Sequence, residues 1–303
     1  MLLAPVDFII SSTKQIDIVN RREVTLERFD FGKKVEPWGI APAPDGSLYV
    51  GLTTNQIARI AGGKISKFQR TVGNAPFFLL AVEGGDIWFA DLGGHRVGRM
   101  SPGGIFDELF DLRKMAPAEL CLGPDGKIWT VISNRSQLVR LTASGERSDL
   151  SHPNARAIAT GLGGRIITVD DGYIWEIDEE DEWRRSKFPE GFSPAALVRT
   201  PDDSLWFTDF KRNLLCNVIH LREGIEYRFS EDIAPFRVAA DADGSLWFPG
   251  REGGSFFNLR PDGTATEYAV KGADAALMDV AIAADGSLWF TEPYRYRVAR
   301  FAR

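Results

Sequence analysis

Asp285-Gly286-Ser287-Leu288-Trp289-Phe290-Thr291-Glu292 is the fullest copy of a phrase that recurs along this chain of 303 residues. Each copy places a tight turn, most often containing Asp and Gly, before a short apolar run that in the fullest copies is aromatic and ends in an acid. The copies occupy residues 45–50, 85–91, 125–130, 163–170, 202–209, 243–249 and 285–292. Their regular recurrence decides the fold.

The spacing of the copies predicts a repeat protein. A period of roughly 40 residues is that of one four-stranded propeller blade, which cannot bury its sheet faces alone and must stack on its neighbours. We therefore expect an all-β fold, a seven-bladed β-propeller with four-stranded blades. Residues 36–303 would form the seven repeats within a single domain that spans residues 1–303. In the best-formed repeat, strands are expected at residues 235–240, 245–248, 255–259 and 264–270.

The two ends of the chain are expected to close the ring together. The last repeat ends at Arg303 after its third strand, without a fourth. Residues 23–31 have the alternating pattern of an outer strand, so we expect them to pair with the C-terminal blade and hide both edges. Residues 1–22 form an extra N-terminal segment, with strand-like patterns at residues 8–11 and 15–19 that could duplicate or displace strands of the closing blade.

Composition excludes several functional classes. The formal net charge is -6 and the charged residues are interspersed, so we expect no nucleic-acid partner. Cys121 and Cys216 fall at different places in different repeats, which predicts apolar fillers rather than a disulfide. The N-terminus lacks a basic region before an apolar run, and no stretch is long enough to span a bilayer. We expect a soluble, cytoplasmic monomer with no membrane partner.

Two longer phrases carry a family resemblance. Leu288-Trp289-Phe290-Thr291-Glu292 is followed by Arg297-Val298-Ala299-Arg300-Phe301, and Ile87-Trp88-Phe89-Ala90-Asp91 by Arg96-Val97-Gly98-Arg99-Met100. This pattern resembles the repeat of the streptogramin B lyase (virginiamycin B lyase) family of seven-bladed propellers, from Glu36 to Arg303. Calcium-dependent propeller lactonases share the architecture, but their phrase is less similar.

The resemblance implies a chemistry that can be compared with this chain residue by residue. Lyases of the family carry Glu-Pro-His-x-Ile before an inner strand, a second Pro-His in the preceding blade, and a downstream Glu. Their glutamates hold magnesium, and a histidine is the general base that opens a depsipeptide ester by elimination. Here Glu36-Pro37-Trp38-Gly39-Ile40 keeps the motif except for its histidine, and the downstream Glu position falls near Thr53, which cannot replace a carboxylate as a metal ligand.

We call the residue aligned with the family histidine in each repeat the lead-in position. The seven lead-in positions carry Trp38, Phe77, Ala118, Arg156, Ala195, Phe236 and Met278, and none carries histidine. The chain's three histidines, His95, His152 and His220, fall in loops or in an alternating strand outside these positions. The resemblance therefore implies the fold and the functional face, without the family's base.

The larger lead-in side chains are the candidate ligand-binding residues. They should converge on one mouth of the central channel and form an aromatic-rimmed pocket for a ring-containing or peptidic ligand, or alternatively plug the channel. Arg156 and Arg237 belong to the same lead-in regions and could fix an anion or a carbonyl in that pocket, although Arg237 could instead point sideways into a neighbouring blade. The candidate ligand-binding set is Trp38, Phe77, Arg156, Phe236, Arg237 and Met278.

Acids at the ends of the second strands are the candidate metal ligands. Asp91, Asp170, Asp209 and Glu292 recur at one position of the repeat, and carboxylates around one axis favour Mg²⁺ or Ca²⁺. Glu36 joins them through its motif. Repeated acids also accept backbone N–H bonds and cap turns, which is the alternative interpretation. The metal candidates are Glu36, Asp91, Asp209 and Glu292.

Three functional hypotheses follow. The first is a propeller that binds a small-molecule or peptidic ligand, or a protein partner, at its central face without histidine-dependent elimination. The second is a metal-assisted carbon–oxygen lyase or lactone hydrolase that acts on a cyclic ester such as a streptogramin-type depsipeptide through Asp91, Asp209 and Glu292. The third is a protein-interaction scaffold or inhibitor. No Gly-x-Ser-x-Gly elbow, Cys-His pairing or phosphate-binding loop supports other chemistry.

Overall fold

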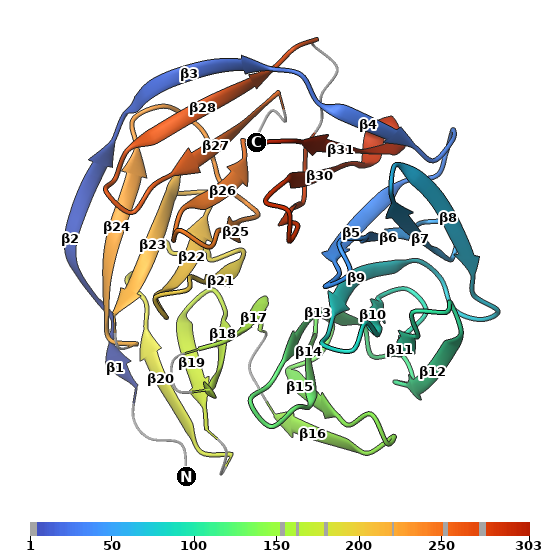
Figure 1. Cartoon of the computed structure of the whole chain (residues 1–303). Coiled ribbons are helices and arrows are strands. Elements are labelled where there is room, and N and C mark those ends of the chain that lie inside the picture. Colours follow the sequence, from blue (N-terminus) through green and yellow to red (C-terminus); the bar gives the residue numbers. More distant parts are fainter. Residues whose placement is uncertain are drawn as a thin grey trace.

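Seven small β-sheets stand side by side around one axis (Figure 1). The computed structural model describes residues 5–151, 155–161, 164–178, 181–219, 221–250, 254–272 and 277–303. In these residues each sheet is one blade, and consecutive strands of a blade run antiparallel from the axis outward. The expected seven-bladed propeller is confirmed, with one difference in strand number described below.

Each of blades 1 to 3 is one run of four strands. Blade 1 holds β5 (Pro37–Pro42), β6 (Leu48–Leu52), β7 (Gln56–Ala61) and β8 (Lys64–Gln69). Blade 2 holds β9 (Pro76–Ala81), β10 (Ile87–Asp91), β11 (Arg96–Met100) and β12 (Phe106–Asp111). Blade 3 holds β13 (Pro117–Leu122), β14 (Ile128–Ile132), β15 (Gln137–Leu141) and β16 (Arg147–Ser151).

Blades 4 to 7 combine C-terminal repeats with strands from the N-terminus. Blade 4 holds β17 (Ala157–Thr160), β18 (Ile166–Val169), β19 (Tyr173–Ile177), β20 (Trp183–Lys187) and β1 (Val6–Asp7). Blade 5 holds β21 (Leu197–Arg199), β22 (Leu205–Asp209), β23 (Leu214–Ile219), β24 (Glu223–Phe229) and β2 (Ile9–Ile16). Blade 6 holds β25 (Ala239–Ala240), β26 (Leu246–Pro249), β27 (Ser255–Leu259), β28 (Ala265–Val270) and β3 (Ile18–Val24). Blade 7 holds β29 (Val280–Ile282), β30 (Leu288–Glu292), β31 (Arg297–Phe301) and β4 (Glu27–Asp30), with a short 3-10 helix at Pro293–Arg295.

The recurring phrase forms the second strand of each blade. In blades 1, 2, 3 and 7 every residue of this strand is buried, because neighbouring blades cover both of its faces. This explains the near-continuous apolar run, since a strand covered on both faces does not alternate. Outer strands such as β8 and β16 are mostly exposed and carry mainly polar side chains instead. The hydrophobic core is therefore a series of clusters between adjacent blades.

The N-terminal segment wraps around the outside of three blades. Strands β1, β2 and β3, which we call the strap, add parallel fifth strands to the outer edges of blades 4, 5 and 6 (Figure 1). These blades thus have five strands, where the repeat pattern alone predicted four. None of the three strap strands joins blade 7, so the closing blade has four strands.

Three apolar side chains fasten the strap. Phe8 packs with the residues between blades 4 and 5, Ile16 with those between blades 5 and 6, and Leu26 with those between blades 6 and 7. They are 3%, 4% and 4% exposed. The spacing of these residues therefore matches the passage of the strap across successive blade boundaries.

Ring closure occurs as expected, through a shorter strand. β4 (Glu27–Asp30) pairs antiparallel with β31 and completes blade 7 from the N-terminal side. The expected strand began at residue 23, but Glu23 and Val24 pair with Ala269 and Val270 of blade 6 instead. The chain therefore changes blades between Val24 and Glu27. Among the described residues, no helix is long and apolar enough to cross a membrane.

Candidate functional site

The lead-in positions lie on one face of the ring, which we call the mouth face. The first residues of the inner strands pair with the last residues of the second strands, as Pro37 does with Leu52 and Pro76 with Asp91. In blades 1, 2 and 3 the pairing shifts register there, so Trp38, Phe77 and Ala118 fall in β-bulges. A bulge re-aims a side chain that would otherwise alternate with its neighbours.

Trp38 and Phe77 form an aromatic pair on the rim between blades 1 and 2. Their ring centroids are 5.4 Å apart in an edge-to-face arrangement, and both side chains are half-buried. A Cβ atom on Gly39 would lie 2.3 Å from the carbonyl oxygen of Phe77, so only glycine allows the two backbones to approach this closely. The Trp38 Nε1 atom is buried and has no hydrogen-bond acceptor. The indole is therefore held by packing alone.

A second aromatic group lies on the opposite side of the axis, in blades 5 and 6. Phe236 is 43% exposed and its ring lies 5.6 Å from that of Phe210. The guanidinium carbon of Arg237 lies 5.4 Å from the Phe236 centroid and 5.7 Å from the centroid of Phe78 in blade 2. Arg237 thus reaches across the channel to the far blades. The alternative that it points sideways into an adjacent blade is wrong.

Below the rim, charged side chains meet inside the channel. Arg237 Nη1 forms an ion pair with Glu119 Oε1 from blade 3, and Glu119 Oε2 accepts a hydrogen bond from the Ile158 N–H at 3.3 Å. Asp279 of blade 7 lines the same space, a cavity of about 190 Å³ that is lined by residues from all seven blades. Side chains therefore narrow the channel below the mouth.

The charges in the channel influence one another. Burial alone would lower the pKa of the Arg237 guanidinium, but the carboxylates of Glu119 and Asp279 hold it above its ordinary value. Withdrawal from bulk water raises the pKa of Asp279, against the attraction of Arg237. Glu119 and Asp279 were not anticipated from the sequence. Their signal was available, because each directly follows a lead-in position, as Arg237 does.

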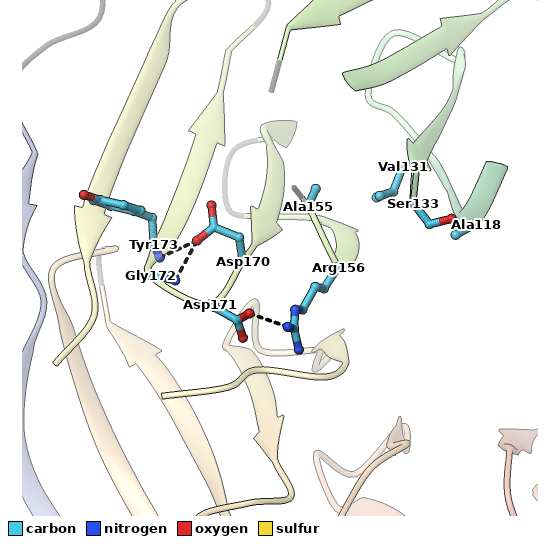
Figure 2. A pocket seen from close by; sticks show the side chains of 9 residues that line it. All are labelled: Ala118, Val131, Ser133, Ala155, Arg156, Asp170, Asp171, Gly172 and Tyr173. Atoms are coloured by element: carbon cyan, nitrogen blue, oxygen red, sulfur yellow. Dashed lines mark hydrogen bonds and ion pairs between the residues drawn. The ribbon is translucent and has the colours of Figure 1, made fainter. Parts of the chain in front are cut away.

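Arg156 lines a cavity of about 640 Å³ beside the mouth, between blades 3 and 4. Figure 2 shows its guanidinium directed toward Asp171, with which it forms an ion pair. Its Nη1 atom also lies 3.4 Å from the hydroxyl of Ser193. Across the cavity lie Ala118, Val131 and Ser133 from blade 3 (Figure 2). The guanidinium of Arg156, the carboxylate of Asp171 and the serine hydroxyls are therefore available to a polar ligand at this cavity.

The six candidate ligand residues are therefore distributed around the rim. Trp38 contacts Phe77, and Phe236 contacts Arg237, while Arg156 lies in the separate cavity. Met278 is half-buried, and its backbone N–H donates to the Thr291 carbonyl at 2.9 Å. The structure places all six on one face without joining them into one contact cluster.

Two of the candidate metal ligands, Asp91 and Asp209, accept hydrogen bonds from the loops around them. Asp91 accepts hydrogen bonds from Arg70 Nη1 at 3.0 Å, the Asn74 N–H at 2.5 Å and the Gly94 N–H at 2.6 Å. Asp209 accepts from the Ser193 N–H at 2.8 Å and the Arg212 N–H at 3.1 Å. These contacts are those of turn-capping carboxylates.

The remaining two acids, Glu292 and Glu36, differ from this pattern. Glu292 is fully buried and pairs with Arg297 at 2.7 Å and with Arg28 at 3.6 Å. The Glu36 backbone pairs with Thr53, whose hydroxyl accepts the Glu36 N–H at 3.0 Å. In the part of the chain that the structure describes, no three His, Cys, Asp or Glu residues group as metal ligands would. Binding of Mg²⁺ or Ca²⁺ stays a prediction.

Of the three histidines, the structure describes His95. His95 has a left-handed backbone, with φ of 57°, and its Nδ1 lies 3.2 Å from the Met115 carbonyl oxygen. His152 and His220 lie outside the described residues.

Comparison with known proteins agrees with the architecture. The model of the virginiamycin B lyase family matches residues 21–182 and 154–303, which together cover nearly the whole chain. The chain belongs to the virginiamycin B lyase family. A curated virginiamycin B lyase from Nocardia farcinica (strain IFM 10152) is 24% identical over 223 residues, 69% of this chain and 76% of the relative.

Solved structures of virginiamycin B lyases share the fold. A streptogramin B lyase superimposes with a TM-score of 0.83 at 22% identity, covering 91% of this chain and 96% of its own. A catalytically inactive histidine-to-alanine variant of virginiamycin B lyase from Staphylococcus aureus, with quinupristin, gives a TM-score of 0.82 at 20% identity, covering 91% and 98%. The family match begins at residue 21, so most of the strap lies outside it.

Proposed function

We propose that this member of the virginiamycin B lyase family binds a ring-containing or peptidic ligand on its mouth face and does not open it by histidine-dependent elimination. The observation that carries the proposal is the identity of the seven lead-in residues. The general base of the family would stand at one of these positions, and here each holds an aromatic, aliphatic or arginine side chain. None of these can accept a proton near neutral pH.

The geometry of the mouth supports binding. Trp38 with Phe77 and Phe236 with Phe210 place two aromatic groups on opposite sides of the rim. Aromatic side chains supply large apolar contact area at low entropic cost, and exposed aromatic groups often mark a binding surface. Arg156 with Asp171 adds a polar anchor at the neighbouring cavity. Such a combination of apolar area and few polar groups is typical of ligand pockets.

The test is to incubate the protein with a streptogramin B depsipeptide such as quinupristin, which accompanies the Staphylococcus aureus relative. Binding is followed by calorimetry and by tryptophan fluorescence. Turnover is followed by chromatography and mass spectrometry, since elimination yields an isomer of the lactone and hydrolysis adds one water. We expect binding with the lactone recovered intact.

Two variants locate the binding. Trp38→Leu should weaken binding by about tenfold, as expected for the loss of one aromatic contact. Ile105→Ala, at an apolar side chain that is 75% exposed in the turn between β11 and β12 on the opposite face, is the matched control and should bind as the unmodified chain does. Formation of either ring-opened product, or binding that Trp38→Leu leaves unchanged, would contradict the proposal.

A further inference from the structure

An aromatic ring covered by an arginine recurs on the blades. In blade 1, Tyr49 of the second strand faces Arg59 of the third strand, whose guanidinium carbon lies 6.0 Å from the ring centroid. The same guanidinium donates to the carboxylate of Asp45 in the preceding turn at 2.7 Å. We call the ring and this turn aspartate a guanidinium socket, because together they supply a π-face and an anion.

Three other blades hold an arginine of their own at the position of Arg59. In blade 7, Arg300 lies 5.6 Å from the Trp289 centroid and pairs with Asp285 at 2.6 Å. In blade 3 the arginine lies 5.2 Å from the ring, and in blade 2 it faces the ring across the strand pair. The ring and arginine pairs of these two blades are Trp129 with Arg140 and Trp88 with Arg99.

Blade 6 shows that a guanidinium from another segment can cover the aromatic ring of a second strand. Its third strand has Asn258 at the arginine position, opposite Trp247. Arg303, from the end of the chain beside blade 7, lies 5.4 Å from the Trp247 centroid and pairs with Asp241. Trp247 is consequently 4% exposed. The loss of the strand's own arginine is thus compensated from outside the blade.

Blade 5 has the same loss without the compensation. Trp206 faces Asn217 across the strand pair, and among the described residues no cation lies over its ring. Trp206 is half-buried, whereas its equivalents Trp88, Trp129 and Trp289 are 3%, 3% and 7% exposed. A cavity of about 480 Å³ opens beside it, between blades 5 and 6 on the face opposite the mouth.

The cavity is lined by groups that suit a cation. Asp202 is the turn aspartate of blade 5, and Asp243 lies across the cavity from it. In the described chain neither carboxylate forms an ion pair, and the Thr200 hydroxyl that bonds Asp202 at 2.6 Å helps to lower the pKa of this carboxyl. Asp202 therefore carries negative charge at neutral pH.

One cation already lies near this site. Lys14 of the strap is 4.7 Å from the Tyr227 centroid and donates to the Tyr227 hydroxyl at 3.0 Å. The Tyr227 ring in turn packs against Trp206 at 4.8 Å. Lys14 thus covers the Tyr227 side of the pair and is not among the residues that line the cavity.

We infer that the cavity between blades 5 and 6 is a binding site for a guanidinium group supplied by another molecule, such as an arginine side chain of a peptide or protein. The guanidinium stacks on Trp206 and donates to Asp202, as Arg59 and Arg300 do in their own blades. Asp243 adds a second acceptor from the other wall. This site lies on the face opposite the proposed ligand mouth and is independent of it.

The experiment is a titration of the full chain with N-acetyl-arginine amide, followed by the tryptophan indole N–H signals in NMR. The Trp206 signal is assigned with Trp206→Phe. An isolated cation–π contact with one charged hydrogen bond predicts a dissociation constant on the order of 1 mM. N-acetyl-citrulline amide, which has the same shape without the charge, should bind at least about tenfold more weakly.

Substitution at the site distinguishes a socket from a nonspecific acidic surface. Asn217→Arg should remove binding, because the strand then supplies its own guanidinium, and Asn217→Gln is the matched control that should retain it. Asp202→Asn should weaken binding by roughly fivefold to tenfold, because the charge of the acceptor is lost. This variant keeps an oxygen acceptor in the turn, so it tests the site if Asn217→Arg fails to fold. Absence of a saturable shift at Trp206, equal binding of citrulline, or binding that both Asn217→Arg and Asp202→Asn leave unchanged would overturn the inference.

Discussion

Along the channel axis, Arg237 from blade 6 meets Glu119 from blade 3 and carries its charge close to Asp279 from blade 7. Two carboxylates thus share one guanidinium in a narrow space. The carboxylate of Glu119 has the direct ion pair, whereas Asp279 accepts backbone hydrogen bonds from Val280, at 3.0 Å, and from Ile40. Asp279 is therefore the weaker partner.

This asymmetry predicts a pH-dependent stability. Because burial raises the pKa of Asp279, the folded state binds its proton more tightly than the unfolded state, so the contribution of Asp279 to the free energy of unfolding falls as pH rises from the ordinary value of 3.8 through the folded-state pKa. Asp279→Asn removes this penalty and should stabilise the protein by on the order of 1 kcal/mol at neutral pH. The gain should vanish below pH 3.8. Urea unfolding across this range measures it, and a variant that is less stable at neutral pH would show that Asp279 is needed as a charge.

The two cysteines should be chemically inert in the folded protein. Burial raises the pKa of the Cys121 thiol to about 12, and it also raises that of Cys216. Since the thiolate is the reactive species, labelling by a disulfide reagent near neutral pH should proceed only as fast as the chain unfolds. Rapid labelling of either cysteine without denaturant would contradict the burial seen here.

Residue-scale prediction from the sequence was only partly possible. The repeat gave the lead-in positions, but the side chain that enters the channel is the next one, as at Glu119, Arg237 and Asp279. At Glu119 a one-residue bulge decides which of two neighbours faces the axis, and a bulge has no sequence signature in a single chain. The contact between Arg237 and Glu119 joins residues 118 positions apart, which no local pattern specifies.

At the scale of elements, the acid that ends a second strand holds the loops around it. Asp91 is fully buried and accepts hydrogen bonds from the buried Arg70 and from two backbone N–H groups. Asp91→Ala leaves a buried guanidinium without this carboxylate and should cost about 3–5 kcal/mol of unfolding free energy.

The matched control is Asp111→Ala, whose carboxylate is 59% exposed and pairs with Arg96 at the surface. It should cost less than about 1 kcal/mol. Chemical denaturation compares the two variants, with and without Mg²⁺. If Mg²⁺ stabilised the unmodified chain but not Asp91→Ala, the carboxylate would be a metal ligand rather than a turn cap.

The strap should detach separately from the ring. Phe8 is 3% exposed and contacts Phe188 at 5.2 Å, whereas the neighbouring Ile9 is 62% exposed. Phe8→Ala should accelerate hydrogen exchange in β1 and β2 while the inner strands keep their protection, because edge elements open below the global unfolding energy. Ile9→Ala should leave exchange unchanged. Equal acceleration throughout the propeller would instead make the strap part of one cooperative unit.

At the scale of the whole molecule, the architecture followed from the repeat because each blade needs its neighbours. The fully buried second strands, such as β6 and β10, gave continuous apolar runs that a single sequence displays clearly. The strap was recognised as strand-like but could not be placed. Its parallel pairing with β24 and β28 depends on edges that only the assembled ring presents.

Our central proposal also concerns the whole molecule: this propeller binds a ligand on its mouth face although its lead-in positions hold no histidine. The measurement that tests it most directly is mass spectrometry and chromatography of quinupristin after incubation with saturating protein, alongside a calorimetric titration of the same sample. We predict heat of binding that depends on Trp38 and a depsipeptide recovered intact. A ring-opened isomer, formed at a rate proportional to protein concentration, would contradict the account.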